Sequence, residues 1–155
     1  MLKIDVFPHI LPRRFYDRLM DVAPRSGLMV KRVSNIPVMI DLDRRFEIMD
    51  RHEGYRQVLT LAAPPLEAIA GPDLTPDLAK LANDEMAAIV HKHSDRFPAF
   101  VAQLPMNNPN AAVREIDRAI GDLGATGVQI YTNVAGRALG FSAPGQPQPE
   151  LYTMD

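Results

Sequence analysis

The sequence contains no cysteine, which excludes disulfide frameworks and zinc sites built on thiolates. No apolar run approaches the roughly 20 residues that a membrane-spanning helix needs. At the N-terminus, Asp5 and Pro8 interrupt any signal-like apolar segment. We therefore expect a cytoplasmic protein that does not contact a membrane.

An excess of one charge sign is also absent. Lys and Arg total 17 and Asp and Glu total 19, which gives a net charge of -2. This balance argues against nucleic acid or an anionic membrane as the main partner, because either would favour a strong basic excess. No GxGxxG or GxxxxGK[ST] loop follows the first predicted strand, so nucleotide binding is not expected.

Helix signals are the clearest feature that is present. Pro12, Pro76 and Pro109 each stand where a first helical residue fits, and the latter two follow possible N-caps, Thr75 and Asn108. Apolar residues then recur at helical spacing. The pattern predicts helices over residues 12–23, 43–53, 76–93 and 109–123, with Gly54 and Gly124 closing the second and fourth.

Short apolar runs separate these helices and predict strands that are buried on both faces of a parallel sheet. They cover residues 2–6, 56–63, 99–105 and 126–132. Four strand–helix units make half of a (β/α)8 TIM barrel, since a closed barrel needs about 250 residues and the chain has 155. The competing arrangement, an open doubly wound sheet, lacks its usual phosphate loop. We predict a half-barrel over 1–139, an inserted hairpin over 25–42, and an irregular Pro-rich tail over 140–155.

Ligands of parallel α/β folds gather at the C-terminal ends of the strands. These ends fall at residues 7–9, 63–65, 105–108 and 132–133, and they offer one imidazole, His9, together with a hydroxyl and several amides, but no carboxylate, lysine or cysteine. Residues two apart on an extended chain point the same way, so histidines at 7 and 9 could hold one metal ion, but residue 7 is Phe. A single histidine cannot hold a catalytic metal. His9 is therefore either a metal ligand completed from elsewhere or a histidine beside a turn.

Three other features of the sequence are candidate sites. His91 and His93 lie near a predicted helix end, where residues two apart diverge by about 200°, so we expect no chelating pair. Arg45 is either part of a solvated helix face or a substrate-binding residue. Asn133, at the end of the last predicted strand, either orients a substrate or holds a loop.

Four stretches together resemble the N-terminal half of an amidohydrolase superfamily branch, the one containing aminocarboxymuconate-semialdehyde decarboxylase and related aromatic-acid decarboxylases and hydratases. They are IDVFPHILP, RRFEIMDRHEGYRQVLTLAAPP, NDEMAAIVHKHSDRFPAFVAQLPMNNPNAAVREIDRA and LGATGVQIYTNVAGRAL, covering most of residues 2–139. The resemblance implies a metal-containing (β/α)8 barrel, commonly with zinc and often dimeric. It also implies a small aromatic or unsaturated carboxylic acid as substrate.

The resemblance gives the first strand end a specific meaning. In the family an HxH pair there ligates the metal; His9 matches its second histidine, and Phe7 stands at the first. The other ligands and the acid–base histidine come from later strands. Residues 35–38 replace a region where some members carry a substrate arginine, and Gly140 stands where an acidic residue is usual.

Two hypotheses about function follow from this resemblance. One is the N-terminal part of a metal-dependent decarboxylase or hydrolase, inactive alone and completed by a homo-oligomer or a complementary C-terminal half. The other is a non-catalytic binding or assembly module that kept the fold and lost the metal, for which Phe7 is the discriminating residue. An unrelated four-unit α/β domain that binds a small ligand is the third possibility.

Overall fold

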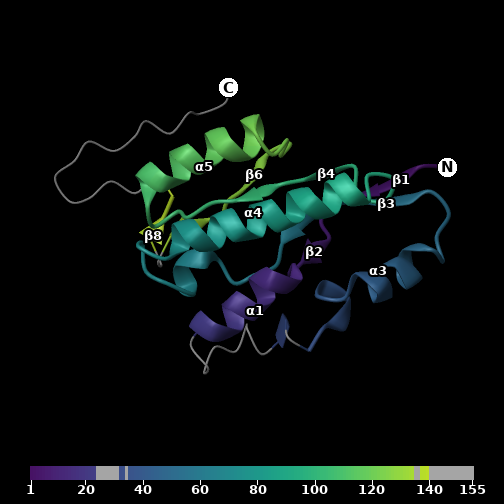
Figure 1. The fold of residues 1–155 in the computed structure, drawn as a ribbon, viewed down its shortest axis with the longest axis horizontal. Coiled ribbons are helices and arrows are strands. Elements are labelled where there is room, and N and C mark those ends of the chain that lie inside the picture. Colours follow the sequence, from purple (N-terminus) through teal and green to yellow (C-terminus); the bar gives the residue numbers. More distant parts are fainter. Residues whose placement is uncertain (24–31, 34, 135–136, 140–155) are drawn as a thin grey trace.

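The computed structural model describes residues 1–23, 32–33, 35–134 and 137–139. Parallel strands form its centre, and helices connect them (Figure 1). The strands are β1 (Lys3–Asp5), β2 (His9–Ile10), β3 (Tyr55–Leu61), β4 (Ala99–Phe100), β5 (Ala102–Gln103), β6 (Val128–Gln129), β7 (Asn133–Val134) and β8 (Arg137–Ala138). The helices are α1 (Arg13–Val22), α3 (Leu42–Met49), α4 (Thr75–Lys92) and α5 (Pro109–Gly121), with short 3₁₀ segments η1 (Pro37–Met39) and η2 (Leu66–Ala68).

Strand pairing follows the order of the chain. β3 pairs in parallel with β1 and β2 and with β4, and β5 pairs in parallel with β6. Sequential units are therefore neighbours, which is the order found along the wall of a (β/α)8 barrel. The only antiparallel pair among the described residues is the small hairpin of β7 and β8, which follows the last parallel strand.

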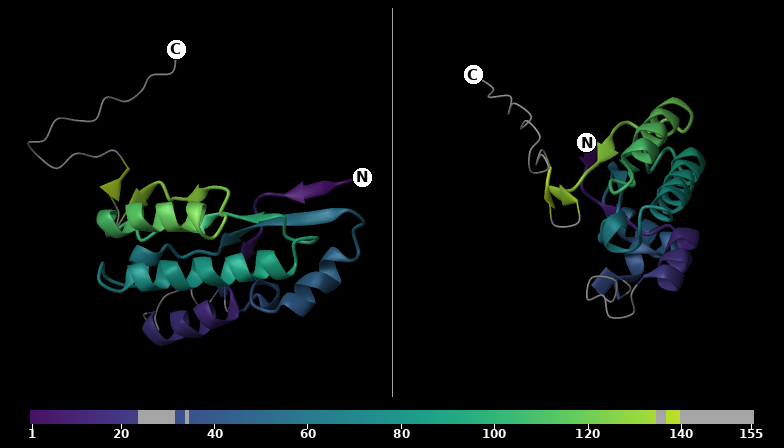
Figure 2. Two further views of the ribbon diagram at one scale, coloured as in Figure 1. Left: turned by 45° about the horizontal axis from the view of Figure 1, so that its top comes forward. Right: turned by 90° about the vertical axis from the view of Figure 1, so that its left-hand side faces the viewer.

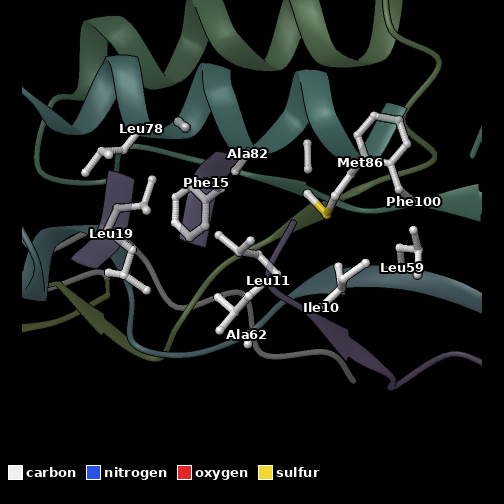
Figure 3. Packing of buried hydrophobic residues seen from close by; sticks show 14 of the residues in the cluster. Ile10, Leu11, Phe15, Leu19, Leu59, Ala62, Leu78, Ala82, Met86 and Phe100 are labelled. Carbon is white, nitrogen blue, oxygen red and sulfur yellow. The ribbon is translucent and has the colours of Figure 1, made fainter. Parts of the chain in front are cut away.

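Helices α1, α4 and α5 lie on one side of the strands (Figure 2), and the core fills the space between. Met86 of α4 is buried there beside Phe100 of β4, and Phe15 of α1 is buried farther along the cluster, near Leu11 and Leu19 (Figure 3). Unlike the core, the two edge strands leave apolar side chains exposed to solvent. Ile4 in β1 is 51% exposed and Ile130, just after β6, is 52% exposed. Part of the apolar surface of these strands is thus left uncovered by the described residues.

The first strand is interrupted by a bulge, which the sequence did not predict. Asp5 pairs with Gln57 and His9 with Thr60, so three residues (6–8) stand opposite two (58–59). A carboxylate oxygen of Asp5 accepts a hydrogen bond from the Phe7 amide at 2.9 Å, which fixes the extra residue. The strand predicted to end at residue 6 therefore resumes at His9, and bulges of this kind re-aim side chains beside functional sites.

The helix starts agree only partly with the predicted caps. Asn108 caps α5 as expected, accepting from the Ala111 amide at 3.1 Å. Thr75 is not an N-cap but the first residue of α4, and its hydroxyl donates to Asn107 Oδ1 at 2.6 Å. The helix predicted over 43–53 begins one residue earlier, capped by Asp41, and ends at Met49.

The predicted hairpin over 25–42 is wrong in its second arm. Pro37–Met39 form a 3₁₀ turn, in which Pro37 supplies a fixed helical φ, and α3 starts at Leu42. Most of the first arm and the tail over 140–155 lie outside the described residues. No helix in the described part of the chain is both long and apolar enough to cross a bilayer.

Candidate functional site

A pocket of about 580 Å³ opens at the C-terminal ends of the strands. Its walls are largely apolar, and a few polar side chains face it. The lining residues are Val6, Phe7, His9, Thr60, Ala63, Val101, Val128, Gln129, Ile130, Tyr131 and Thr132. Three of the four predicted strand ends therefore meet at one place, through Phe7, His9, Ala63 and Thr132, whereas residues 105–108 at the end of the third predicted strand do not line this pocket.

Thr60 fixes the orientation of the His9 ring. Its hydroxyl lies 2.8 Å from His9 Nδ1 and donates its proton to the Pro8 carbonyl at 2.7 Å. A hydroxyl has one proton to give, so toward His9 it must accept, and Nδ1 must carry the hydrogen. This arrangement leaves the lone pair on Nε2, the nitrogen then available to a metal ion or a proton donor.

The surroundings of His9 also favour the uncharged form of its imidazole. Burial lowers the pKa of the His9 imidazole below its usual range, and the positive charge of Arg45 lowers it further. The carboxylate of Asp5 acts in the opposite direction but with less effect. A neutral imidazole is the form that ligates metals.

The side chains at positions 7 and 9 lie together, as the spacing predicted. The ring centroids of Phe7 and His9 are 4.7 Å apart in an edge-to-face arrangement, and Phe7 is 76% exposed. A phenyl ring has no lone pair, and the Asp5 carboxylate already accepts from the Phe7 amide and from the Tyr55 hydroxyl. Within the described ranges, no group of three or more His, Asp or Glu could hold a metal ion. These residues alone therefore do not fit a metal site.

Arg45 is buried beneath His9 and does not belong to a solvated helix face, so that alternative is wrong. Its guanidinium donates to the His9 carbonyl oxygen, and to Gln57 Oε1 at 2.8 Å. A third bond runs to the Val38 carbonyl at 3.2 Å. Burial lowers the pKa of Arg45 despite the opposing effects of Tyr55 and Asp5. These contacts hold the backbone of β2 in place, and a substrate contact stays a prediction.

The remaining sequence candidates lie apart from His9. Asn133 is exposed and begins β7, while its neighbour Thr132 lines the pocket. Its substrate-binding role also stays a prediction. His91 is exposed, whereas the His93 ring packs 5.0 Å from the Phe46 ring, so the two histidines do not converge.

Sequence reasoning missed several polar residues of the pocket. Thr60 lies within an apolar predicted strand, where nothing in the sequence distinguishes it. Its position opposite His9 in the strand register allows it to bind the His9 ring. Gln129 and Tyr131 line the pocket, and their side chains are joined by a 3.2 Å hydrogen bond. Their spacing of two residues on a predicted strand was the available signal, since such residues share a face.

Comparison with known proteins identifies the family model "Amidohydrolase", which matches residues 37–143. The γ-resorcylate decarboxylase of Rhizobium sp. (strain MTP-10005) is 37% identical over 110 residues, which cover 71% of this chain and 31% of the relative. The corresponding enzyme of Polaromonas sp. (strain JS666) is 40% identical over 110 residues, with the same coverage. The 2-amino-3-carboxymuconate-6-semialdehyde decarboxylase of Dictyostelium discoideum is 28% identical over 153 residues, with coverages of 89% and 42%.

The solved structures that superpose on this chain include decarboxylases as well. The 2,6-dihydroxybenzoate decarboxylase from Rhizobium superposes with a TM-score of 0.64 at 32% identity, covering 83% of this chain and 38% of that one. A dihydroxybenzoic acid decarboxylase from Polaromonas sp. JS666, with bound manganese and the inhibitor 2-nitroresorcinol, gives 0.62 at 32% identity, covering 82% and 37%. The 5-carboxyvanillate decarboxylase from Sphingomonas paucimobilis gives 0.73 at 22% identity, covering 86% and 44%, and supports the fold alone.

These matches confirm the predicted fold class, half of a (β/α)8 barrel. The chain spans about a third of the length of the γ-resorcylate decarboxylases that it matches. For the metal, the Polaromonas structure contains manganese, whereas the family resemblance suggested zinc. The metal in that relative is thus divalent, but it is not the zinc that the resemblance implies.

Proposed function

Because this chain belongs to the amidohydrolase family, we propose that it forms the N-terminal half of a barrel that decarboxylates small aromatic acids. The observation that carries the proposal is the pocket at the strand ends, with His9 held by Thr60 at its wall. A volume of about 580 Å³ suits a single substituted ring. The apolar walls suit the faces of that ring.

In this proposal the half-barrel supplies binding surface and one metal ligand. His9 presents Nε2, and Arg45 positions it through its carbonyl oxygen. Asn133, beside the pocket-lining Thr132, is the candidate at the rim for orienting the substrate carboxylate. In this proposal the chain is inactive alone, because the described residues supply one metal ligand and not a complete metal site.

A complementary C-terminal half is the partner that fits best. Exposed apolar side chains lie at the edges of the strands, namely Ile4 (51%), Val6 (68%) and Ile130 (52%), and a second half of a barrel would cover them. Pairing with a second copy of the chain, the other expected partner, would cover the same surface.

Reconstitution tests this proposal. The chain is prepared alone and fused to the unmatched C-terminal part of the Rhizobium γ-resorcylate decarboxylase, which keeps the two halves together. We expect the fusion to bind a divalent metal by elemental analysis and to release CO2 from γ-resorcylate, and the chain alone to do neither. A folded fusion with no bound metal contradicts the proposal.

A second candidate, a non-catalytic binding module, is favoured by Phe7. This ring is 76% exposed beside His9 and offers apolar surface at the position where the resemblance implies a metal ligand. Phe7→His separates the two candidates. If His9 is poised for metal, the variant gains measurable zinc or manganese affinity by calorimetry, with stability changed by less than about 0.5 kcal/mol, as for an exposed site. His9→Asn in the same background must abolish that gain. Absence of any gain favours the binding module.

A further inference from the structure

The bulge in the first strand decides which side of the strands His9 faces. Paired residues of parallel strands point to the same side, and successive residues of a strand alternate between the two sides. Asp5 pairs with Gln57, so without an extra residue His9 would pair with Leu61, which is buried in the core on the helix side. With the bulge it pairs with Thr60, which lines the pocket. The extra residue therefore turns His9 from the core to the pocket.

Charged side chains hold both ends of this bulge. At its start, Asp5 Oδ1 accepts from the Phe7 amide at 2.9 Å. At its end, the guanidinium of Arg45 donates to the carbonyl oxygen of His9. Arg45 is 4% exposed, and its other bonds go to a backbone carbonyl and to the Gln57 amide, so the carboxylate of Asp5 is not its direct partner.

Two side chains of β3 connect these charges. Gln57 Oε1 accepts from Arg45 at 2.8 Å, and Gln57 Nε2 donates to the Tyr55 hydroxyl at 3.1 Å. The Tyr55 hydroxyl donates to Asp5 Oδ2 at 2.7 Å. Every bond thus runs from the cation toward the carboxylate, and hydrogen bonds polarised in one direction strengthen one another. We call these four residues the polar chain.

The charged ends fix the direction of the polar chain. A guanidinium only donates, so the Gln57 amide must turn Oε1 toward Arg45 and Nε2 toward Tyr55. A carboxylate only accepts, so the Tyr55 hydroxyl must donate to Asp5. Burial raises the pKa of Tyr55, and the bond to Asp5 raises it further, so the hydroxyl keeps its proton. The polar chain therefore has one hydrogen-bonding pattern, and loss of either middle residue leaves its two ends unconnected.

We propose that Tyr55 and Gln57 are positioning residues, which hold the bulge at both ends through Asp5 and Arg45 and so keep His9 facing the pocket. Neither of the two belongs to the described residues that line this pocket, so they act through the backbone of the bulge and not by touching a ligand. The inference goes beyond the proposed function. It concerns the direction of His9, and it applies equally to a metal-dependent decarboxylase and to a binding module.

Breaking the polar chain in the full-length ¹⁵N-labelled protein tests the proposal, with no metal or ligand added. Tyr55→Phe removes one oxygen and keeps the ring, and Gln57→Met keeps the length of the side chain without its hydrogen bonds. In either variant we expect the Phe7 amide to exchange with solvent at least tenfold faster, because the carboxylate that accepts its proton is no longer held. The ¹⁵N shifts of the His9 ring should move away from the Nδ1–H form, since an imidazole that turns from the pocket loses Thr60.

A loss of stability alone has a different signature, because it accelerates amide exchange throughout the fold. The Ala112 amide of α5 donates to the Asn108 carbonyl at 2.9 Å, and its exchange rate should stay within twofold of the wild type in both variants. Tyr16→Phe, the same change on α1, is the matched control. It should leave the Phe7 exchange rate and the His9 shifts unchanged.

Unchanged Phe7 exchange and His9 shifts in the folded variants overturn the proposal. Acceleration of the Ala112 amide equal to that of Phe7 overturns it as well, because the polar chain would then only stabilise the fold. If Gln57→Met does not fold, Tyr55→Phe decides alone, since it removes a single oxygen. No step of this test uses a metal, a substrate or a C-terminal half, so its failure and the failure of the proposed function are distinguishable.

Discussion

At the scale of single residues, the chemistry of His9 depends on a hydroxyl from the neighbouring strand. Thr60 accepts from Nδ1 and donates to the Pro8 carbonyl, so one side chain fixes both the ring and the bulged backbone before it. The guanidinium of Arg45 donates a hydrogen bond to the carbonyl oxygen of His9. A neutral, oriented imidazole is thus present even though the described residues do not complete a metal site.

Replacing Thr60 by Val tests this arrangement. The change leaves Pro8 O and His9 Nδ1 without their partner, so we expect the free energy of unfolding to fall by about 1–2 kcal/mol in urea denaturation. The ¹⁵N shifts of the His9 ring should move from the Nδ1–H form toward a mixture of tautomers. Thr60→Ser, which keeps the hydroxyl, serves as the control and should retain the wild-type shifts. A pure Nδ1–H form in Thr60→Val would show that the hydroxyl does not select the tautomer.

Residue-level prediction from sequence succeeded where the signal was local. The two-residue spacing placed Phe7 and His9 side by side, and the helical spacing separated His91 from His93. It missed Thr60 and Gln57 because their importance depends on what lies across the strand. That information resides in the register of the sheet, which a single sequence does not display.

At the scale of elements, α4 and α5 are joined to the strands by a buried amide. Asn83 of α4, which is fully buried, donates to the Gln103 carbonyl at 2.9 Å and to Glu115 Oε1 at 2.7 Å, and accepts from the Gln103 amide at 2.8 Å. Arg118 donates to both Glu115 and Asp84, which ties α5 back to α4. This polar junction sets the position of β5.

Asn83→Ala tests the junction. The change leaves the amide and carbonyl of Gln103 and one oxygen of Glu115 buried without this partner, each at about 1–3 kcal/mol. We expect the free energy of unfolding to fall by at least about 2 kcal/mol in chemical denaturation. Asn110→Ala, on the exposed side of α5, is the matched control, and we expect a change of less than about 0.5 kcal/mol. Equal losses in the two variants would falsify the structural role of Asn83.

The elements themselves were predictable to different degrees. Pro109 and Asn108 carry their own signal, since proline fixes φ and asparagine caps the helix, and α5 begins as predicted. The bulge over residues 6–8 and the 3₁₀ turn at Pro37–Met39 were not found. Both depend on how the chain meets β3 and α3, because tertiary contacts override the local pattern of apolar residues there.

At the scale of the whole molecule, helices α1, α4 and α5 of the half-barrel lie on one side of its strands (Figure 2). Apolar side chains are exposed at the edges of the strands. Ile4 and Val6 lie at the β1 edge, and Val128 and Ile130 lie at the β6 edge. Edge strands with exposed apolar side chains are prone to pair with another chain. The same surface would be buried in a completed barrel, so the fold predicts association of the chain when it is prepared alone.

Sedimentation of the isolated chain tests this prediction. We expect concentration-dependent self-association of the wild type, and a monomer for Val6→Lys combined with Ile130→Lys, because lysines at both edges oppose pairing. Val6 is 68% and Ile130 is 52% exposed, so the melting temperature should change little. Val113→Lys provides the matched control, since Val113 is 59% exposed but lies on α5, and it should associate like the wild type. A monomeric wild type, or equal dissociation by Val113→Lys, would mean that the strand edges do not drive association.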